Sequence, residues 1–398
     1  MKIVIALTSA ADQISGVQRH AINLARCLLT REEVTAVHLI VASWQQQCLR
    51  SVEPIRDARL HLHTAHLSNT SIGRNLWYYT KLPRIAAELK ADIVHLAYPM
   101  PIRRHMYGCP TVLTLHDLYP YDAPGNFGFP KVLFNEAILH QCLQAADAIT
   151  CVSHSTRHRL ETIGPQLARS KATVVFNCVE PQNHVSDRGP VPGWTGEPFL
   201  LCVAQHRQNK NLLLLLRVFR TLLLTNRLRA GARLVIIGVH GPQTKPMQRF
   251  LTLNQLQDRV SLLNGLSDEE VQWCYRNCNL LIAPSVVEGF GLPVAEALLA
   301  GCHVVCSDIP AFREVGGDRC EYIRLDKNAE QAFAEAVSTV SHRPRPEPVA
   351  LPHLSATHIA EQYLQLYRSL LRPAPSPDTL VFEPTASSQG EIACYEKR

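Results

Sequence analysis

Two glutamates, Glu288 and Glu296, stand on either side of a glycine-rich segment. The apolar residues 280–283 before them predict a buried strand. Pro293 suits the first position of a helix, and Gly301 suits the position just past its end. Glu288 is therefore expected on a loop at the carboxyl end of a strand, and Glu296 in the first turn of the helix that follows. In an open parallel sheet this is the edge where ligands bind, so the two carboxylates are candidates for ligand contacts.

The segment between the two glutamates supplies backbone hydrogen-bond donors. It consists of Gly289, Phe290, Gly291 and Leu292, followed by the proline. The first N–H groups of a helix have no partner inside the helix, and together with the helix dipole they favour a bound anion. We therefore expect these four residues to hold an anionic group such as a diphosphate.

Four further residues suit the same ligand. Lys210 and Arg207 follow the strand predicted at residues 199–204, and fixed cations at this place stabilise charge on a diphosphate. His116 ends another predicted strand. Gly16 lies in the loop after the first strand, where the absence of a Cβ atom lets a ligand approach the backbone closely. The sequence therefore predicts a site built from loops that follow several different strands.

Short apolar runs alternate with longer stretches of helical periodicity along most of the chain. Strands separated by helices indicate parallel sheets with helices on both faces. Residues 182–196, rich in Pro, Gly, Asn and Asp, interrupt the alternation and mark a domain boundary. The predicted strands are residues 2–7, 36–41, 93–96, 111–115, 148–152, 173–176, 199–204, 233–238, 260–263, 280–283 and 303–307. The predicted helices include residues 17–29, 76–89, 132–145, 212–226, 245–256, 268–277 and 355–371.

The predicted fold class is α/β, with two Rossmann-like, doubly wound parallel-sheet domains that face a cleft. The first domain is expected at residues 1–185, a linker at 186–196 and the second domain at 197–354. A helix at 355–372 is expected to pack back toward the first domain, and residues 373–398 to form a tail without fixed structure.

The composition excludes several classes of protein. With 398 residues, 46% hydrophobic and 19% charged, the chain is globular rather than disordered or fibrous. No apolar run approaches the ~20 residues that span a bilayer, and no signal peptide is recognisable. The 13 cysteines include no C-x2-C pair, which predicts reduced, mostly buried thiols in a cytoplasmic protein.

The net charge of +6 is concentrated in residues 1–190, with 19 Lys and Arg against 14 Asp and Glu. This basic half suits an anionic membrane or acceptor, and ordinary surface charge explains it equally well. The excess is too diffuse for a nucleic-acid groove, so no nucleic-acid partner is expected.

The E-G-F-G-L-P segment with its second glutamate closely resembles the retaining glycosyltransferases of family 4, which have the GT-B fold. The resemblance covers nearly the whole chain, to about Leu371. It includes the motifs Ser15-Gly16-Val17, His116-Asp117, Lys210-Asn211 and Asn264-Gly265-Leu266. It implies transfer of a hexose from a nucleotide sugar, such as GDP-mannose or a UDP-hexose, with retention of configuration and without a metal or other cofactor. The His116-Asp117 motif, together with residues 75–83 and the Lys210-Asn211 context, favours mannose as the sugar.

The resemblance also implies roles for the residues singled out above. Glu296 would bind the ribose hydroxyls, Glu288 would contact the donor sugar near its reacting face, and His116 would reach the transferring group. Lys210 would hold the phosphates. The acceptor would be a glycan or a lipid-linked hydroxyl, met in the cytoplasm or at the inner face of a membrane, in surface glycan or lipopolysaccharide assembly.

Two departures from the family pattern keep alternatives open. The family usually carries Gly-Arg after the strand that ends near Ala204, whereas this chain has Gln205-His206-Arg207, which leaves the role of Arg207 open. Only one glycine, Gly16, stands where the family often has two. The alternatives are another GT-B enzyme, either a phosphorylase or a nucleotide-sugar epimerase, and a non-catalytic nucleotide- or sugar-binding protein.

Other clusters of polar residues predict no site. His61, His63 and His66 alternate as on a half-exposed strand, which favours a strand over a metal tract. The chain contains no D-x-D, G-x-G-x-x-G or G-x4-G-K-[ST] motif, so neither a metal-dependent single-sheet glycosyltransferase, a dinucleotide oxidoreductase nor a P-loop enzyme is supported.

Overall fold

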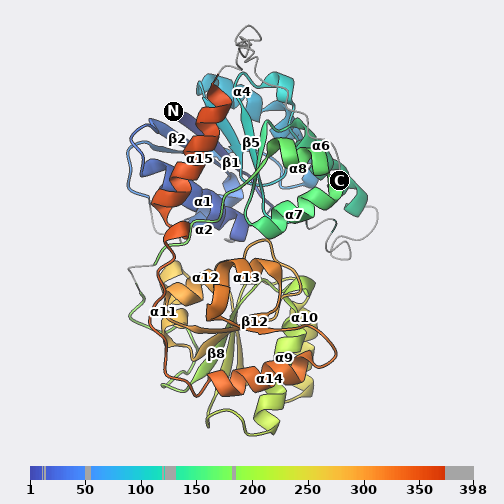
Figure 1. The fold of residues 1–398 in the computed structure, drawn as a ribbon, viewed down its shortest axis with the longest axis vertical. Helices are drawn as coiled ribbons and strands as arrows, with labels where there is room; N and C mark the ends of the chain where they lie inside the picture. The colour runs from blue at the N-terminus through green and yellow to red at the C-terminus, as the bar shows by residue number, and fades with distance from the viewer. Residues whose placement is uncertain are drawn as a thin grey trace, which may run out of the picture.

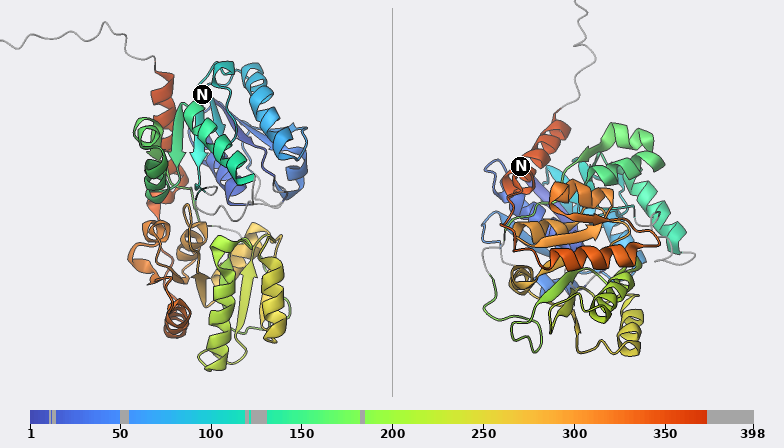
Figure 2. Two further views of the ribbon diagram at one scale, coloured as in Figure 1. Left: turned by 90° about the vertical axis from the view of Figure 1, so that its right-hand side faces the viewer. Right: turned by 60° about the horizontal axis from the view of Figure 1, so that its bottom comes forward.

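The computed structural model describes residues 1–10, 12, 15–49, 55–118, 121, 131–181 and 185–372. They form two parallel sheets in separate halves of the molecule, each with helices on both faces (Figures 1 and 2). The predicted α/β class with two doubly wound sheets is confirmed. We call the half built on the first sheet the N-terminal domain and the half built on the second sheet the C-terminal domain.

The first sheet has seven parallel strands in the order β3-β2-β1-β4-β5-β6-β7. The five inner strands β2, β1, β4, β5 and β6 are almost entirely buried, as is typical of parallel sheets, whereas the edge strands β3 and β7 are partly exposed. Alternate residues of β1 enter different cores: Ile3 and Ile5 face one helix layer, and Val4 faces the other. The bounds are β1 Lys2–Leu7, β2 Ala36–Ala42, β3 Leu60–Ala65, β4 Ile93–Leu96, β5 Thr111–Leu115, β6 Ala148–Cys151 and β7 Ala172–Val174.

The helices of the N-terminal domain correct one prediction. The continuous helix expected at residues 76–89 is wrong, because the segment is divided into α3 and α4 at Lys81. Pro83 lies in the first turn of α4, where its missing N–H is tolerated, whereas inside a continuous helix it would break a hydrogen bond. The bounds are α1 Gly16–Leu29, α2 Gln46–Leu49, α3 Ser71–Thr80, α4 Leu82–Glu88, α6 Lys131–Ala145, α7 His154–Ile163 and α8 Pro165–Lys171.

The second sheet has six parallel strands in the order β10-β9-β8-β11-β12-β13, and helices again cover both faces. The bounds of the strands are β8 Phe199–Val203, β9 Arg233–Ile237, β10 Val260–Leu263, β11 Leu280–Ala283, β12 His303–Ser307 and β13 Glu321–Ile323. The bounds of the helices are α9 Leu212–Leu224, α10 Thr244–Leu253, α11 Asp268–Asn277, α12 Leu292–Leu299, α13 Pro310–Gly316 and α14 Ala329–Val340. Short 3-10 helices are η1 Ser43–Gln45, η2 Arg104–Met106, η4 Gln208–Lys210, η5 Gly317–Arg319 and η6 Pro352–Leu354.

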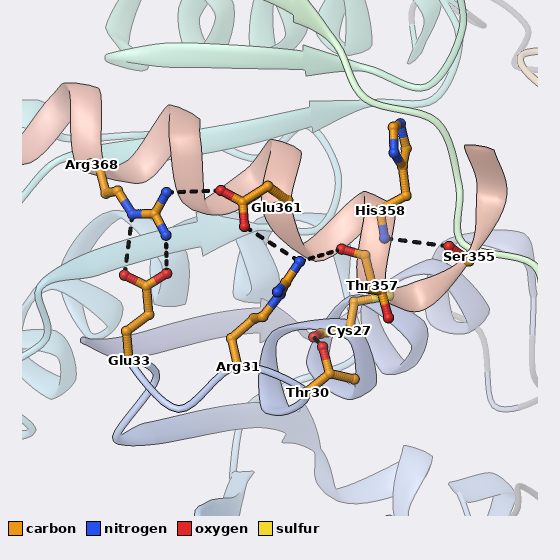
Figure 3. Close-up of polar contacts among 9 residues, drawn as sticks. All are labelled: Cys27, Thr30, Arg31, Glu33, Ser355, Thr357, His358, Glu361 and Arg368. Atoms are coloured by element: carbon orange, nitrogen blue, oxygen red, sulfur yellow. Dashed lines mark hydrogen bonds and ion pairs between the residues drawn. The ribbon is translucent and has the colours of Figure 1, made fainter. Parts of the chain in front are cut away.

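The last helix, α15 (Ala356–Leu371), returns to the N-terminal domain and lies beside α1 (Figure 1). Its Tyr363 and Tyr367 are fully buried in the core that α1 and the first sheet share. Polar contacts also hold α15 against the turn that follows α1. Arg368 pairs with Glu33 of this turn, and Arg31 donates a hydrogen bond to the Thr357 carbonyl at 2.8 Å (Figure 3). In the sequence, the second sheet therefore stands between two segments that both belong to the N-terminal domain.

Several further predictions can be compared with the described residues. The eleven cysteines whose side chains the structure describes are free, and most are buried, as expected. Within the described ranges, no helix has both the length and the apolar character needed to cross a bilayer. The tail predicted at 373–398 lies outside the described residues.

Candidate active site

A cavity of about 780 Å³ lies between the two domains, at the carboxyl ends of strands from both sheets. All ten residues proposed from the sequence line this one cavity. They are Gly16, His116, Arg207, Lys210, Glu288, Gly289, Phe290, Gly291, Leu292 and Glu296. The fold thus brings together side chains that are up to 280 positions apart in the chain.

Lys210 and Glu288 form a close ion pair in the wall of the cavity. The Lys210 Nζ atom lies 2.6 Å from each carboxylate oxygen of Glu288. Both side chains are mostly buried, which strengthens the pairing of a cation with an anion. An ammonium group has three donors, so Lys210 retains one for a ligand while it holds Glu288 with two.

A tight turn places Lys210 opposite Glu288. Asn211 adopts a left-handed conformation, with φ of 52°, and ends the short helix η4 before α9 begins. The backbone N–H of Val286 donates to the Asn209 carbonyl at 2.8 Å, which joins this turn to the Glu288 loop. The Asn209 Oδ1 atom is buried without a protein partner, and Asn209 lines the cavity, so it offers an acceptor to a ligand.

Gly289 lies in a close contact between the two domains. A Cβ atom built on Gly289 would lie 1.7 Å from the carbonyl oxygen of His116, so only glycine fits. The Gly289 carbonyl accepts hydrogen bonds from the hydroxyls of Ser153, at 2.5 Å, and Thr156, at 3.1 Å. The glycine-rich loop of the C-terminal domain therefore lies directly against the strand end that carries His116.

Two further contacts join the domains. The Arg19 guanidinium of α1 donates to both carboxylate oxygens of Asp268, the first residue of α11, at 2.6 Å each. The Glu314 carboxylate of α13 accepts the backbone N–H groups of His154 and Ser155, at 2.7 and 2.6 Å, at the start of α7. Anionic side chains are stabilised at helix N-termini, so this second contact closes the domains on the side of α7.

Glu296 is the fifth residue of α12 rather than the fourth, as predicted, because the helix begins at Leu292, one residue before Pro293. Its Oε2 atom accepts a hydrogen bond from the Tyr275 hydroxyl at 2.8 Å. Burial raises the pKa of the Glu296 carboxyl above its usual value, and the nearby Arg19 charge and the Tyr275 hydrogen bond oppose that shift. Gly301 has the positive φ, 66°, that was expected just past the helix end.

His116 is held neutral by its surroundings. Its Nε2 atom lies 2.8 Å from the Ala97 carbonyl, which can only accept, so Nε2 carries the proton. Burial lowers the pKa of His116 to about 4. The ring packs edge-to-face with His20, at 4.8 Å between centroids. Because its Nε2–H already donates to Ala97, His116 offers one hydrogen-bond acceptor, the Nδ1 atom, rather than a positive charge, to whatever occupies the cavity.

A buried network connects this region to α15. His20 lies 3.2 Å from the Thr114 hydroxyl, and His95 lies 2.7 Å from the same hydroxyl. The other ring nitrogen of His95 lies 2.7 Å from the Tyr367 hydroxyl. The last helix thus supports the strand end that carries His116 through hydrogen bonds as well as apolar packing.

Comparisons with known proteins agree with this geometry. The family model for glycosyltransferase family 4 matches residues 14–183, and the model for glycosyl transferases group 1 matches residues 190–351. Between them they cover both domains and the cavity. The chain belongs to the family 4 glycosyltransferases.

Relatives of this glycosyltransferase include two bacterial mannosyltransferases. The O-antigen chain mannosyltransferase B of Escherichia coli is 23% identical over 342 residues, which cover 80% of this chain and 85% of the relative. The GDP-mannose:cellobiosyl-diphosphopolyprenol alpha-mannosyltransferase of Xanthomonas oryzae pv. oryzae is 23% identical over 352 residues, covering 86% and 87% of the two chains.

Solved structures place this glycosyltransferase in the GT-B fold. Anabaena Alr3699/HepE in complex with UDP-glucose superimposes with a TM-score of 0.70 at 15% identity, covering 93% of this chain and all of that one. WaaG, a glycosyltransferase involved in lipopolysaccharide biosynthesis, gives 0.65 at 16% identity, covering 93% and 97%. The GT-B fold implied by the sequence resemblance is confirmed.

The sequence analysis gave no role to four residues that shape the site of this glycosyltransferase. They are Arg19, Thr156, Tyr275 and Glu314. Arg19 carried the clearest signal, because it places a charge one helical turn after Gly16. The other three act through contacts between the domains or between neighbouring helices, which the order of residues does not reveal.

No group of three or more His, Cys, Asp and Glu side chains in the described part of this glycosyltransferase is arranged to hold a metal ion. His61 lies on β3 and stacks on His38 of β2, with 4.9 Å between ring centroids, so the alternation read as a strand is confirmed.

Proposed function

We propose that this glycosyltransferase moves a hexosyl group, here assigned as mannosyl, from a nucleoside-diphosphate sugar to a hydroxyl of a glycan or lipid-linked acceptor, with retention of configuration. The observation that carries the proposal is the Lys210–Glu288 pair beside the start of α12, in a cavity lined by both domains. The mannosyltransferase relatives support the sugar, and the UDP-glucose complex of a structural neighbour supports a nucleotide-sugar donor.

In this proposal the nucleotide lies on the C-terminal domain. Glu296, oriented by Tyr275, accepts hydrogen bonds from the ribose hydroxyls. The remaining donor of Lys210 and the N–H groups at the start of α12 bind the diphosphate and stabilise the charge that develops as the glycosidic bond breaks. Arg207 lines the same cavity and supplies a second cation.

The donor sugar lies between Glu288 and His116 in this arrangement. Lys210 contacts both oxygens of Glu288, which lowers the nucleophilicity of that carboxylate. This favours attack by the acceptor hydroxyl on the face that the diphosphate leaves, with the departing phosphate accepting the proton. Gly16 leaves open space on the opposite wall, because a Cβ atom there would meet only Leu292, at 4.0 Å.

The reaction is proposed to take place in the cytoplasm, at the inner face of a membrane, in surface glycan or lipopolysaccharide assembly. The basic excess of residues 1–190 supports contact with an anionic surface.

The decisive experiment is thermal unfolding with GDP, UDP, ADP and dTDP, each in large excess. A nucleotide that binds only the folded protein raises its stability by about 2.7 kcal/mol at a hundred times its dissociation constant. We expect one of the nucleotides to stabilise the wild type and to lose this effect in Glu296→Ala. Glu335→Ala is the control, because Glu335 is exposed on α14, and it should be stabilised as the wild type is. Stabilisation by none of the four would refute the nucleotide-sugar donor and favour a phosphorylase or a non-catalytic sugar-binding protein.

A further inference from the structure

The outer face of α3 and the basic residues beside it carry no role in the site described above. We propose that this surface docks on an anionic lipid bilayer and so holds the mouth of the cleft at the membrane. The inference rests on the proposed function for its purpose, because a lipid-linked acceptor would reach the cleft from that bilayer.

One face of α3 is apolar and exposed. Ile72, Leu76 and Tyr79 have relative exposures of 76%, 59% and 39%. Their spacing of four and three residues places them on one side of the helix, in a single stripe. Three large apolar side chains in line on a surface helix are typical of a face that has a partner. Trp77 and Tyr78, on the inner side of the same helix, are buried.

The inner face of α3 is joined to the wall of the cavity. The Tyr78 hydroxyl accepts the backbone N–H of Thr8 at 3.1 Å, at the end of β1. Asn69, just before α3, donates to the Ala10 carbonyl at 3.2 Å, and Ala10 lines the cavity. The helix therefore separates the cavity from the apolar stripe, so a surface bound to the stripe lies beside the cleft.

Charge identifies the partner as an anionic surface. Residues 71–106 contain six Lys and Arg against two Asp and Glu. Lys81 and Arg84 are exposed at the start of α4. The Arg103 guanidinium lies over the Tyr79 ring, 5.3 Å from its centroid, so a cation borders the stripe itself. Apolar side chains flanked by Lys, Arg and Tyr match the boundary between acyl chains and anionic headgroups.

The C-terminal domain provides a matched control. Leu224 and Leu253 have relative exposures of 67% and 72%, as high as those on α3. Leu224 is the last residue of α9, which begins beside Lys210, so it lies roughly 20 Å along that helix from the cavity. Exposed apolar residues at this distance cannot bring the cleft to a membrane, and they test for non-specific stickiness.

The experiment is sedimentation of the full chain with vesicles of phosphatidylcholine, alone or mixed with phosphatidylglycerol. We expect the wild type to bind the mixed vesicles about ten times more strongly than the neutral ones. Ile72→Ser/Leu76→Ser and Lys81→Glu/Arg84→Glu should each reduce binding to mixed vesicles by about tenfold, whereas Leu224→Ser/Leu253→Ser should bind as the wild type does.

Nucleotide-dependent stabilisation, measured on the same variants, separates the two proposals. It should be unchanged in all of them, which also shows that they fold, because none of the substituted residues lines the cavity. Vesicle binding that depends on the α3 stripe, without stabilisation by any nucleotide, would refute the proposed donor and leave the docking surface standing. Three results would overturn the docking surface: no vesicle binding by the wild type, equal loss in the control pair, or a stripe variant that changes only the oligomeric mass.

Discussion

Replacing Gly289 with alanine should move the two domains apart without unfolding either of them. The added Cβ would lie 1.7 Å from the His116 carbonyl oxygen, whereas real Cβ contacts are essentially never shorter than 3.0 Å. The strand end that carries His116 must therefore retreat by at least 1.3 Å from the loop that carries Glu288. A misplacement of about 1 Å at a reacting centre costs roughly a hundredfold in rate, so turnover should fall by about that factor or more.

The cost in stability should be much smaller than the cost in activity. The hydroxyls of Ser153 and Thr156 would lose the Gly289 carbonyl as acceptor. At about 1 kcal/mol for each hydrogen bond, the free energy of unfolding should fall by about 2 kcal/mol. Nucleotide binding should persist, because alanine keeps the backbone N–H of residue 289 and the other residues proposed to hold the nucleotide also lie on the C-terminal domain.

The assay is donor-dependent nucleotide release, combined with urea unfolding and nucleotide-dependent stabilisation. Gly108→Ala is the matched control, since a Cβ atom there meets nothing within 4 Å. It should leave all three measurements unchanged. If Gly289→Ala kept more than a third of wild-type turnover, the closed contact between Gly289 and His116 would not be the reactive arrangement, and the reasoning would fail.

Three further predictions concern charged and titratable groups. Lys210→Met leaves the Glu288 carboxylate buried and unpaired, so urea unfolding should show a loss of roughly 3 kcal/mol; adding Glu288→Gln should restore the stability but not the turnover. Arg19→Ala and Asp268→Ala should each lower the free energy of unfolding, because each removes one partner of the ion pair between the domains. A double-mutant cycle measured by urea unfolding should give a coupling energy of about 1–3 kcal/mol for the pair. Additive effects would show that the pair does not hold the domains together. The pKa of His116 is lowered to about 4 in the folded protein, against the usual 6.5, so folding favours the neutral imidazole. The free energy of unfolding should therefore be highest above pH 6.5 and should fall as the pH is lowered from 6.5 to about 4. The full loss in the free energy of unfolding is about 3 kcal/mol, measured by urea unfolding at a series of pH values. If His116→Gln lost stability just as steeply with falling pH, His116 would not be the group responsible.

The sequence predicted most of the sheet strands because their apolar runs are short, continuous and bounded by polar turns. Strands β1, β4, β5, β10, β11 and β12 begin and end at the predicted residues. The helix at 76–89 was mispredicted because its apolar periodicity continues through Pro83, whereas the backbone there cannot. Periodicity reports which side of an element is buried, and it is less sensitive to where the element stops.

The candidate site was predictable where ligand chemistry requires particular residue types close to one another in the chain. Glu288, Glu296 and the glycines between them form such a local pattern. The contacts that close the cleft form no local pattern, since Arg19 and Asp268 are 249 positions apart. Their pairing depends on how two complete domains meet, which is a property of the tertiary structure alone. The roles assigned to the ten cavity residues stay predictions until the variants are measured.

The return of α15 to the first domain has a consequence for how the protein is made. A ribosome completes all strands of the first sheet by residue 174, yet Tyr363 and Tyr367, which fill the core against α1, emerge only after the whole second sheet. Until then the part of the first sheet beside α1 is uncovered, and His95 lacks its hydrogen-bond partner at Tyr367. The N-terminal domain is therefore finished only after the C-terminal domain has had time to fold. An N-terminal fragment produced alone should aggregate, whereas one fused to residues 355–372 should stay in solution.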